Sequence, residues 1–131
     1  MGPVVATLLY FIAAGIIVLI GIWVFEMITT KYKDWKEIEE GNYAVALSVG
    51  GKVIGICEIL MFAILENGTI AGTMLWGALG VVLQIVVYFL FEWLTRSFSV
   101  QDKLKENNVA VGIVSFCISV GLGLVIGASI T

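Results

Sequence analysis

Three polar side chains lie inside long apolar runs of this sequence, and groups of these types could carry protons or ions. Lys52 and Glu58 fall in the apolar run 43–65, and Gln84 falls in the middle of the run 70–95. An ionisable group inside a membrane span is unfavourable without a partner, so such residues are functional candidates by default. Lys52 and Glu58 are six residues apart, about 240° around a helix, and cannot form an i,i+4 pair. We expect Lys52 and Glu58 to be either functional or structural. In the structural case they would form an interhelical salt bridge, or Lys52 would snorkel along its stem. Gln84 is a candidate hydrogen-bond partner.

A second set of polar residues occurs twice, at a fixed spacing of 66 residues. A glutamate closes a long apolar run in each copy, and an asparagine precedes the next apolar run, where it is a favoured helix N-cap. In each copy the carboxylate could therefore meet a capped helix start across the loop. This arrangement would be a structural clasp or a vestibule that collects cations. The two sets are Glu26, Thr29 and Asn42 in the first copy and Glu92, Thr95 and Asn108 in the second.

The composition predicts that these residues are held by membrane-spanning helices. Apolar residues make up 60% of the 131 residues and charged residues 13%, against about 25% charged in an ordinary soluble domain. Backbone groups in lipid must be hydrogen-bonded within their own segment, and the runs show no alternation of the barrel kind. We therefore predict an all-α integral membrane protein whose four transmembrane helices span residues 4–28, 43–65, 70–95 and 109–130.

The 66-residue spacing also predicts how the four helices are related. Residues 1–66 and 67–131 would each form a helical hairpin, with a span, a loop and a second span. Both hairpins would have the same orientation, which makes them parallel repeats related by a pseudo-twofold axis along the membrane normal.

The basic residues predict the orientation of these hairpins. They cluster in the two longer loops, while the short turn and both chain ends have none. Since Lys and Arg favour the cytoplasmic side, the loops should be cytoplasmic and both termini outside. The basic loop residues are Lys31, Lys33, Lys36, Arg96, Lys103 and Lys105.

Small residues predict where the helices pack closely. Gly51 and Gly55 in the second span, and Gly123 and Gly127 in the fourth, have the four-residue spacing that allows two helices to approach. Two cysteines inside apolar runs are expected to be small core residues, since they have neither disulfide nor metal-site spacing. They are Cys57 and Cys117.

The first loop has the pattern of a short interfacial helix. Tyr32, Trp35 and Ile38 alternate with charged residues at helical spacing, and the second loop has Phe98 and Leu104 at equivalent positions. Tyr and Trp favour the membrane interface. We expect these residues to anchor the loops, with docking of a cytoplasmic protein partner as the alternative.

The repeated motifs resemble those of a bacterial membrane family known as domain of unknown function 350. The matching motifs are FExxT at 25–29 and 91–95, and NxAVA or NxAVG at 42–46 and 108–112. The resemblance covers nearly the whole chain. It implies tandem two-helix units in the bacterial cell (inner) membrane, and it implies no particular activity.

The sequence leaves three function classes open. The first is a small oligomeric ion or proton pathway, the second is a non-catalytic scaffold or stress-response module that recruits a partner through its loops, and the third is a small multidrug-type transporter. No histidine, nucleotide loop, catalytic triad or metal-ligand motif is present, so we expect no enzyme, catalytic residue, metal or cofactor. The net charge of −3 without a basic stripe indicates no nucleic-acid partner. The expected partners are the lipid bilayer, further copies of the chain and a possible cytoplasmic protein.

Overall fold

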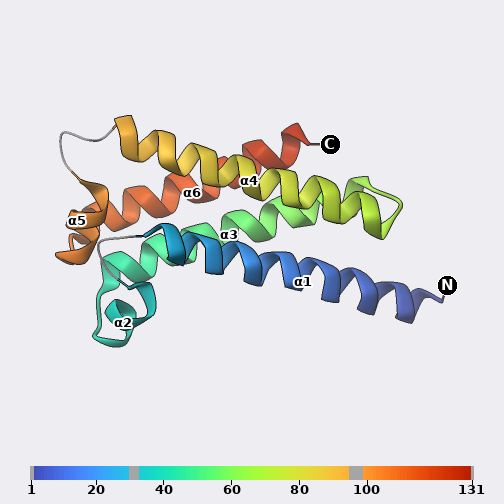
Figure 1. The fold of residues 1–131 in the computed structure, drawn as a ribbon, viewed down its shortest axis with the longest axis horizontal. Helices are drawn as coiled ribbons and strands as arrows, with labels where there is room; N and C mark the ends of the chain where they lie inside the picture. The colour runs from blue at the N-terminus through green and yellow to red at the C-terminus, as the bar shows by residue number, and fades with distance from the viewer. Residues whose placement is uncertain (1, 30–32, 95–98, 131) are drawn as a thin grey trace.

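The computed structural model describes residues 2–29, 33–94 and 99–130, and within these ranges the chain is helical apart from short connections (Figure 1). Four helices are long and apolar enough to cross a membrane, which confirms the predicted spans to within two residues at the described ends. Two short helices follow the first and third spans. The six helices are α1 (Pro3–Ile28), α2 (Asp34–Glu39), α3 (Tyr43–Glu66), α4 (Ile70–Leu94), α5 (Val100–Lys105) and α6 (Val109–Ser129).

The short helices lie at one end of the bundle. Figure 1 shows α2 and α5 at the same end, while both chain ends and the α3–α4 turn lie at the other. The two longer loops therefore share one side, as the two-hairpin prediction requires. The side on which they lie in the cell stays a prediction from the basic residues.

Helices α3 and α6 form the most extensive contact in the bundle, and glycines make it possible. A Cβ atom at Gly123 would lie 2.6 Å from the Cα of Gly55, and one at Gly51 would lie 2.8 Å from the Cα of Phe116. A Cβ at Gly127 would overlap an aromatic ring of α3. All four predicted glycines thus lie at close contacts of α3 and α6, against backbone atoms at Gly51, Gly55 and Gly123 and against the Phe62 ring at Gly127.

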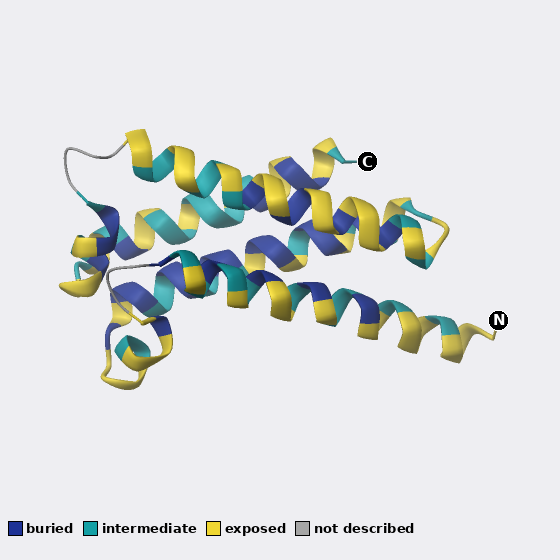
Figure 2. Ribbon diagram, viewed as in Figure 1, coloured by how far each residue is buried: buried dark blue, intermediate teal, exposed yellow. Residues whose placement is uncertain are grey.

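The outer faces of the bundle are apolar, as expected for contact with lipid tails. Figure 2 shows exposed residues along the outer sides of the long helices, with buried residues toward the middle. The prediction that Cys57 and Cys117 are core residues is wrong, since both are exposed. An apolar run cannot distinguish a core position from a lipid-facing one, because both environments are apolar.

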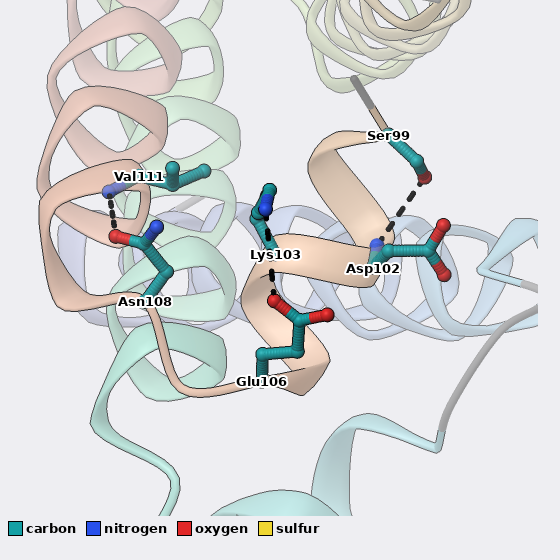
Figure 3. Close-up of polar contacts among 6 residues, drawn as sticks. All are labelled: Ser99, Asp102, Lys103, Glu106, Asn108 and Val111. Atoms are coloured by element: carbon teal, nitrogen blue, oxygen red, sulfur yellow. Dashed lines mark hydrogen bonds and ion pairs between the residues drawn. The ribbon is translucent and has the colours of Figure 1, made fainter.

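The predicted N-caps are confirmed at both helices that follow the loops. The Asn42 side chain accepts a hydrogen bond from the Val45 amide at 3.0 Å. Asn108 accepts one from the Val111 amide at 3.2 Å (Figure 3). Each cap satisfies an amide that the helix itself leaves free.

The interfacial helix predicted in the first loop is α2, and the second loop contains α5. Trp35 of α2 is 54% exposed, whereas Ile38 and Leu104 pack into the core at this end. Ser99 is the N-cap of α5, and its hydroxyl accepts a hydrogen bond from the Asp102 amide at 3.3 Å (Figure 3). Tyr32, Phe98 and Thr95 lie outside the described residues.

Candidate functional site

The lysine in the second span is almost completely buried. Lys52 is only 5% exposed, and its ammonium nitrogen lies 4.6 Å from the ring centre of Tyr88 and 5.3 Å from that of Phe25. The electron-rich faces of aromatic rings attract a cation, and the attraction is stronger where water is excluded. The two rings, from α4 and α1, therefore replace part of the hydration that Lys52 loses.

Two acidic side chains lie within electrostatic range of this lysine. Asp34 and Glu92 both act electrostatically on the Lys52 ammonium. Asp34 lies in the first turn of α2 and is 4% exposed, so the short helix places an acidic side chain in the interior of the bundle. Glu92 comes from the last turns of α4. A buried charge needs such partners, because removing it from water is otherwise prohibitive.

The environment of Asp34 favours its neutral form. Burial raises the pKa of the Asp34 carboxyl above its ordinary value, and the nearby Glu26 carboxylate adds to the rise. The positive charge of Lys52 opposes both effects but does not cancel them. One Asp34 oxygen, Oδ1, is buried and has no hydrogen-bond partner among the described residues. A carboxyl with a raised pKa beside a lysine is a group that can exchange a proton.

A small cavity with apolar and polar lining residues adjoins Lys52. Its volume is about 30 Å³, enough for one or two water molecules. Gln84 lines it, donates from Nε2 to the backbone carbonyl of Lys52 at 3.5 Å, and leaves its buried Oε1 without a partner among the described residues. Gln84 thus does lie beside Lys52, but it contacts the backbone rather than the ammonium. The polar residues that line it are Ser48, Lys52, Gln84, Tyr88, Glu92, Ser115 and Ser119.

A hydrogen-bonded layer closes the site toward the loops. The Tyr88 hydroxyl accepts from Nε2 of Gln101 at 3.0 Å and is also hydrogen-bonded to the Thr29 hydroxyl. Thr29 in turn donates to the Phe25 carbonyl at 2.9 Å. The Ser115 and Ser48 hydroxyls lie 3.3 Å apart across the α3–α6 contact. With these residues included, all six helices contribute to the site.

Asp34 is the site residue that sequence reasoning missed. It stands in a loop rich in charges, where nothing local distinguishes it from its exposed neighbours. The available signal was the residue 66 positions later, Val100, which is apolar and also buried. If the two halves are repeats, as the 66-residue spacing predicts, the Asp34 position would be buried too, and a buried charge needs a partner. Phe25, Tyr88 and Gln101 gave no such signal.

Two other predicted glutamates, Glu26 and Glu58, do not line the cavity. Glu58 has its Oε1 against Gly123 of α6. Glu26, which acts electrostatically on Asp34, lines a surface groove with Trp23 and Lys33.

The expected clasp takes a different form from the one predicted within each hairpin. The Asn42 side chain donates to the carbonyls of Leu104 and Lys105, at 2.9 and 3.2 Å, so it ties the first hairpin to the second. The side-chain oxygen of Asn107 also accepts a hydrogen bond from the Ala44 amide at 3.1 Å. The last residues of α5 present backbone carbonyls at the end of a helix, and the Asn42 amide donates to two of them.

The fold and the site define a multi-pass, four-span membrane bundle with a buried cationic centre. The family model described as "Domain of Unknown Function (DUF350)" matches residues 1–130, and the chain belongs to this family. It is 39% identical to the UPF0719 transmembrane protein YshE of Bacillus subtilis (strain 168), over 92% of this chain and 90% of the relative. It is 25% identical to the UPF0719 inner membrane protein YjfL of Escherichia coli (strain K12), over 79% and 76%. No solved structure matches the chain. The protein is therefore a multi-pass protein of the bacterial cell membrane.

Proposed function

We propose that this protein is a proton pathway centred on Lys52. The single observation that carries the proposal is a lysine that is 5% exposed inside a membrane span, with Asp34 and Glu92 acting on it and a water-sized cavity beside it. Intramembrane chains of ionisable groups and water are the usual route for protons across proteins. The role is non-enzymatic.

The size of the site favours protons over larger cations. A cavity of about 30 Å³ cannot hold a hydrated metal ion, whereas one or two waters suffice to relay a proton. Tyr88 and Gln101 provide hydroxyl and amide groups between the cavity and the loop end of the bundle.

The repeated architecture is part of the proposal. Helices α2 and α5 begin 66 residues apart, as do α3 and α6, and the left-handed residues Gly41 and Asn107 have the same spacing. These correspondences support two parallel hairpins, residues 1–66 and 67–131. In the second hairpin Ile118 and Val100 occupy the positions of Lys52 and Asp34. One copy would then keep the charged centre, and the other would provide an apolar scaffold.

The orientation gives the pathway a direction of access. If both longer loops are cytoplasmic, Asp34 lies at the cytoplasmic end and exchanges protons between Lys52 and that compartment. The oxygen without a hydrogen-bond partner supports this role, because it can receive a proton from water.

Proton flux into liposomes tests the proposal. The purified protein is reconstituted with a pH-sensitive dye inside, and a potassium gradient with an ionophore supplies the driving force. We expect Lys52→Met to reduce the flux to that of protein-free liposomes. The matched control is Ile118→Met, which changes another residue of the same cavity without a titratable group. Wild-type protein without flux, or Lys52→Met with wild-type flux, would contradict the proposal.

A scaffold role is the second candidate, and one observation favours it. Trp35 is 54% exposed on α2, the helix that also carries Asp34. Its indole could anchor α2 in the bilayer interface or bind a cytoplasmic protein. A photo-crosslinker at Trp35 distinguishes the two, since anchoring gives lipid adducts and docking gives one protein adduct. The multidrug-type transporter rests on Glu58 alone and has no further support.

A further inference from the structure

Glu58 is a mid-span carboxylate that the Lys52 site does not use. Its Oε1 is buried and has no hydrogen-bond partner among the described residues. Lipid tails offer no donor, so a carboxylate at this depth needs a partner that the described residues of a single copy do not supply.

The α3–α6 crossing separates Glu58 from the Lys52 site. Gln84 lies against Gly55 on the cavity side, where a Cβ at Gly55 would be 2.6 Å from its Nε2. The Glu58 Oε1 lies against Gly123, only 3.0 Å from where a Cβ of that residue would stand. Because the backbones of Gly55 and Gly123 touch between them, the two polar groups belong to opposite faces of the α3–α6 pair.

The face that bears Glu58 is a continuous stripe along α3. Its residues recur every three or four positions, which is the spacing of a helix–helix seam. Gly50 in this stripe has open space where a Cβ would stand, and with Val109 and Phe116 of α6 it lines an apolar groove of about 500 Å³. The stripe consists of Tyr43, Leu47, Gly50, Ile54, Glu58, Met61 and Leu65, all exposed or half-buried.

We propose that this stripe, the α3 seam, is a self-association surface whose occupant is a second copy of the chain. A twofold axis along the membrane normal places each residue near the axis opposite its own counterpart. Glu58 would then face Glu58 of the other copy, and one protonated carboxyl would donate to the other carboxylate. This arrangement supplies the missing donor, and the small residues of the groove allow close approach. The inference does not depend on proton conduction.

Cysteine crosslinking in native membranes tests the seam. In a background with Cys57→Ser and Cys117→Ser, we expect Ile54→Cys to give a disulfide-linked dimer on oxidation. The matched control is Val82→Cys on α4, because both positions lie about 18 Å from the α3–α4 turn and both are exposed, by 42% and 53%. A dimer with Ile54→Cys alone supports the seam. No dimer, or equal dimer with both, would overturn it.

The contribution of Glu58 is measured separately, by dimer affinity in lipid vesicles at increasing dilution. Glu58→Ala should weaken dimerisation by about 3- to 20-fold, the range for one interhelical hydrogen bond in lipid. Glu58→Gln should retain it, because an amide both donates and accepts. Equal affinity for wild type and Glu58→Ala would overturn the Glu58 pairing. Proton flux is recorded in parallel, so loss of the dimer and loss of conduction are distinguished.

Discussion

The close contact of Gly55 and Gly123 gives the sharpest test of the fold. A methyl group at Gly123 would lie 2.6 Å from the Gly55 Cα and 2.8 Å from its carbonyl oxygen. These are backbone atoms, which cannot rotate away as a side chain can, so α3 and α6 must separate. Overpacking of this kind typically destabilises by about 1–3 kcal/mol. We therefore predict that Gly123→Ala lowers the free energy of unfolding by that amount.

The same helix provides the control. A methyl group at Gly121 would have no described neighbouring atom within 4 Å, so Gly121→Ala adds a methyl group to open space. Alanine is also the better helix former by up to about 1 kcal/mol, so this variant should be neutral or slightly more stable.

Reversible unfolding in mixed micelles, with increasing denaturing detergent, measures the difference between the two variants. The expected gap is about 1–4 kcal/mol in favour of Gly121→Ala. If both variants unfold at the same detergent fraction, α3 and α6 do not cross at this glycine. The α3 seam and the Lys52 site would then not be separated by this crossing.

Two further predictions concern the loop end of the bundle. Asn42→Ala should destabilise the protein more than Asn108→Ala, by about 1 kcal/mol in the same unfolding assay. The reason is that, in the described part of the chain, only Asn42 also donates to α5 carbonyls. Equal losses of stability would contradict this bridge between α3 and α5. The raised pKa of Asp34 means that the folded state disfavours the charged form of this carboxyl. The protonated carboxyl therefore favours folding at low pH. This contribution is lost as the pH rises from the ordinary pKa of 3.8 through the raised pKa of the folded state. Asp34→Asn should remove this pH-dependent contribution, so the difference in unfolding free energy between wild type and variant should change with pH. A constant difference from about pH 3 to 8 would refute the burial of the Asp34 carboxyl.

Features that depend on the immediate surroundings of a residue could be predicted from the sequence. The long helices follow from runs of about 20 apolar residues, since lipid leaves the backbone no other way to satisfy its hydrogen bonds. Asn42 and Asn108 could be predicted as caps because an N-cap acts on an amide three residues away. The glycine pairs could be predicted because only glycine permits the closest helix contacts.

The composition of the site could not be predicted in the same way. Lys52 was found as a candidate, but its partners Asp34 and Glu92 come from different hairpins, and the aromatic rings that cover it look like ordinary apolar residues in the sequence. The direction in which Glu58 faces was equally hidden. A rotation of α3 by a fraction of a turn would exchange the positions of the two residues relative to α4.

The sequence by itself determined that this protein lies in a lipid bilayer. It also determined the number and ends of the long helices and which residues are too polar for their surroundings. The tertiary structure alone decided which of those residues meet. The physical reason is range: the need to satisfy backbone hydrogen bonds in lipid acts within a segment, whereas the balance of a buried charge depends on groups that only helix docking brings within a few ångströms. Lys52 is isolated along the chain and becomes the centre of a polar cluster only when six helices close around it.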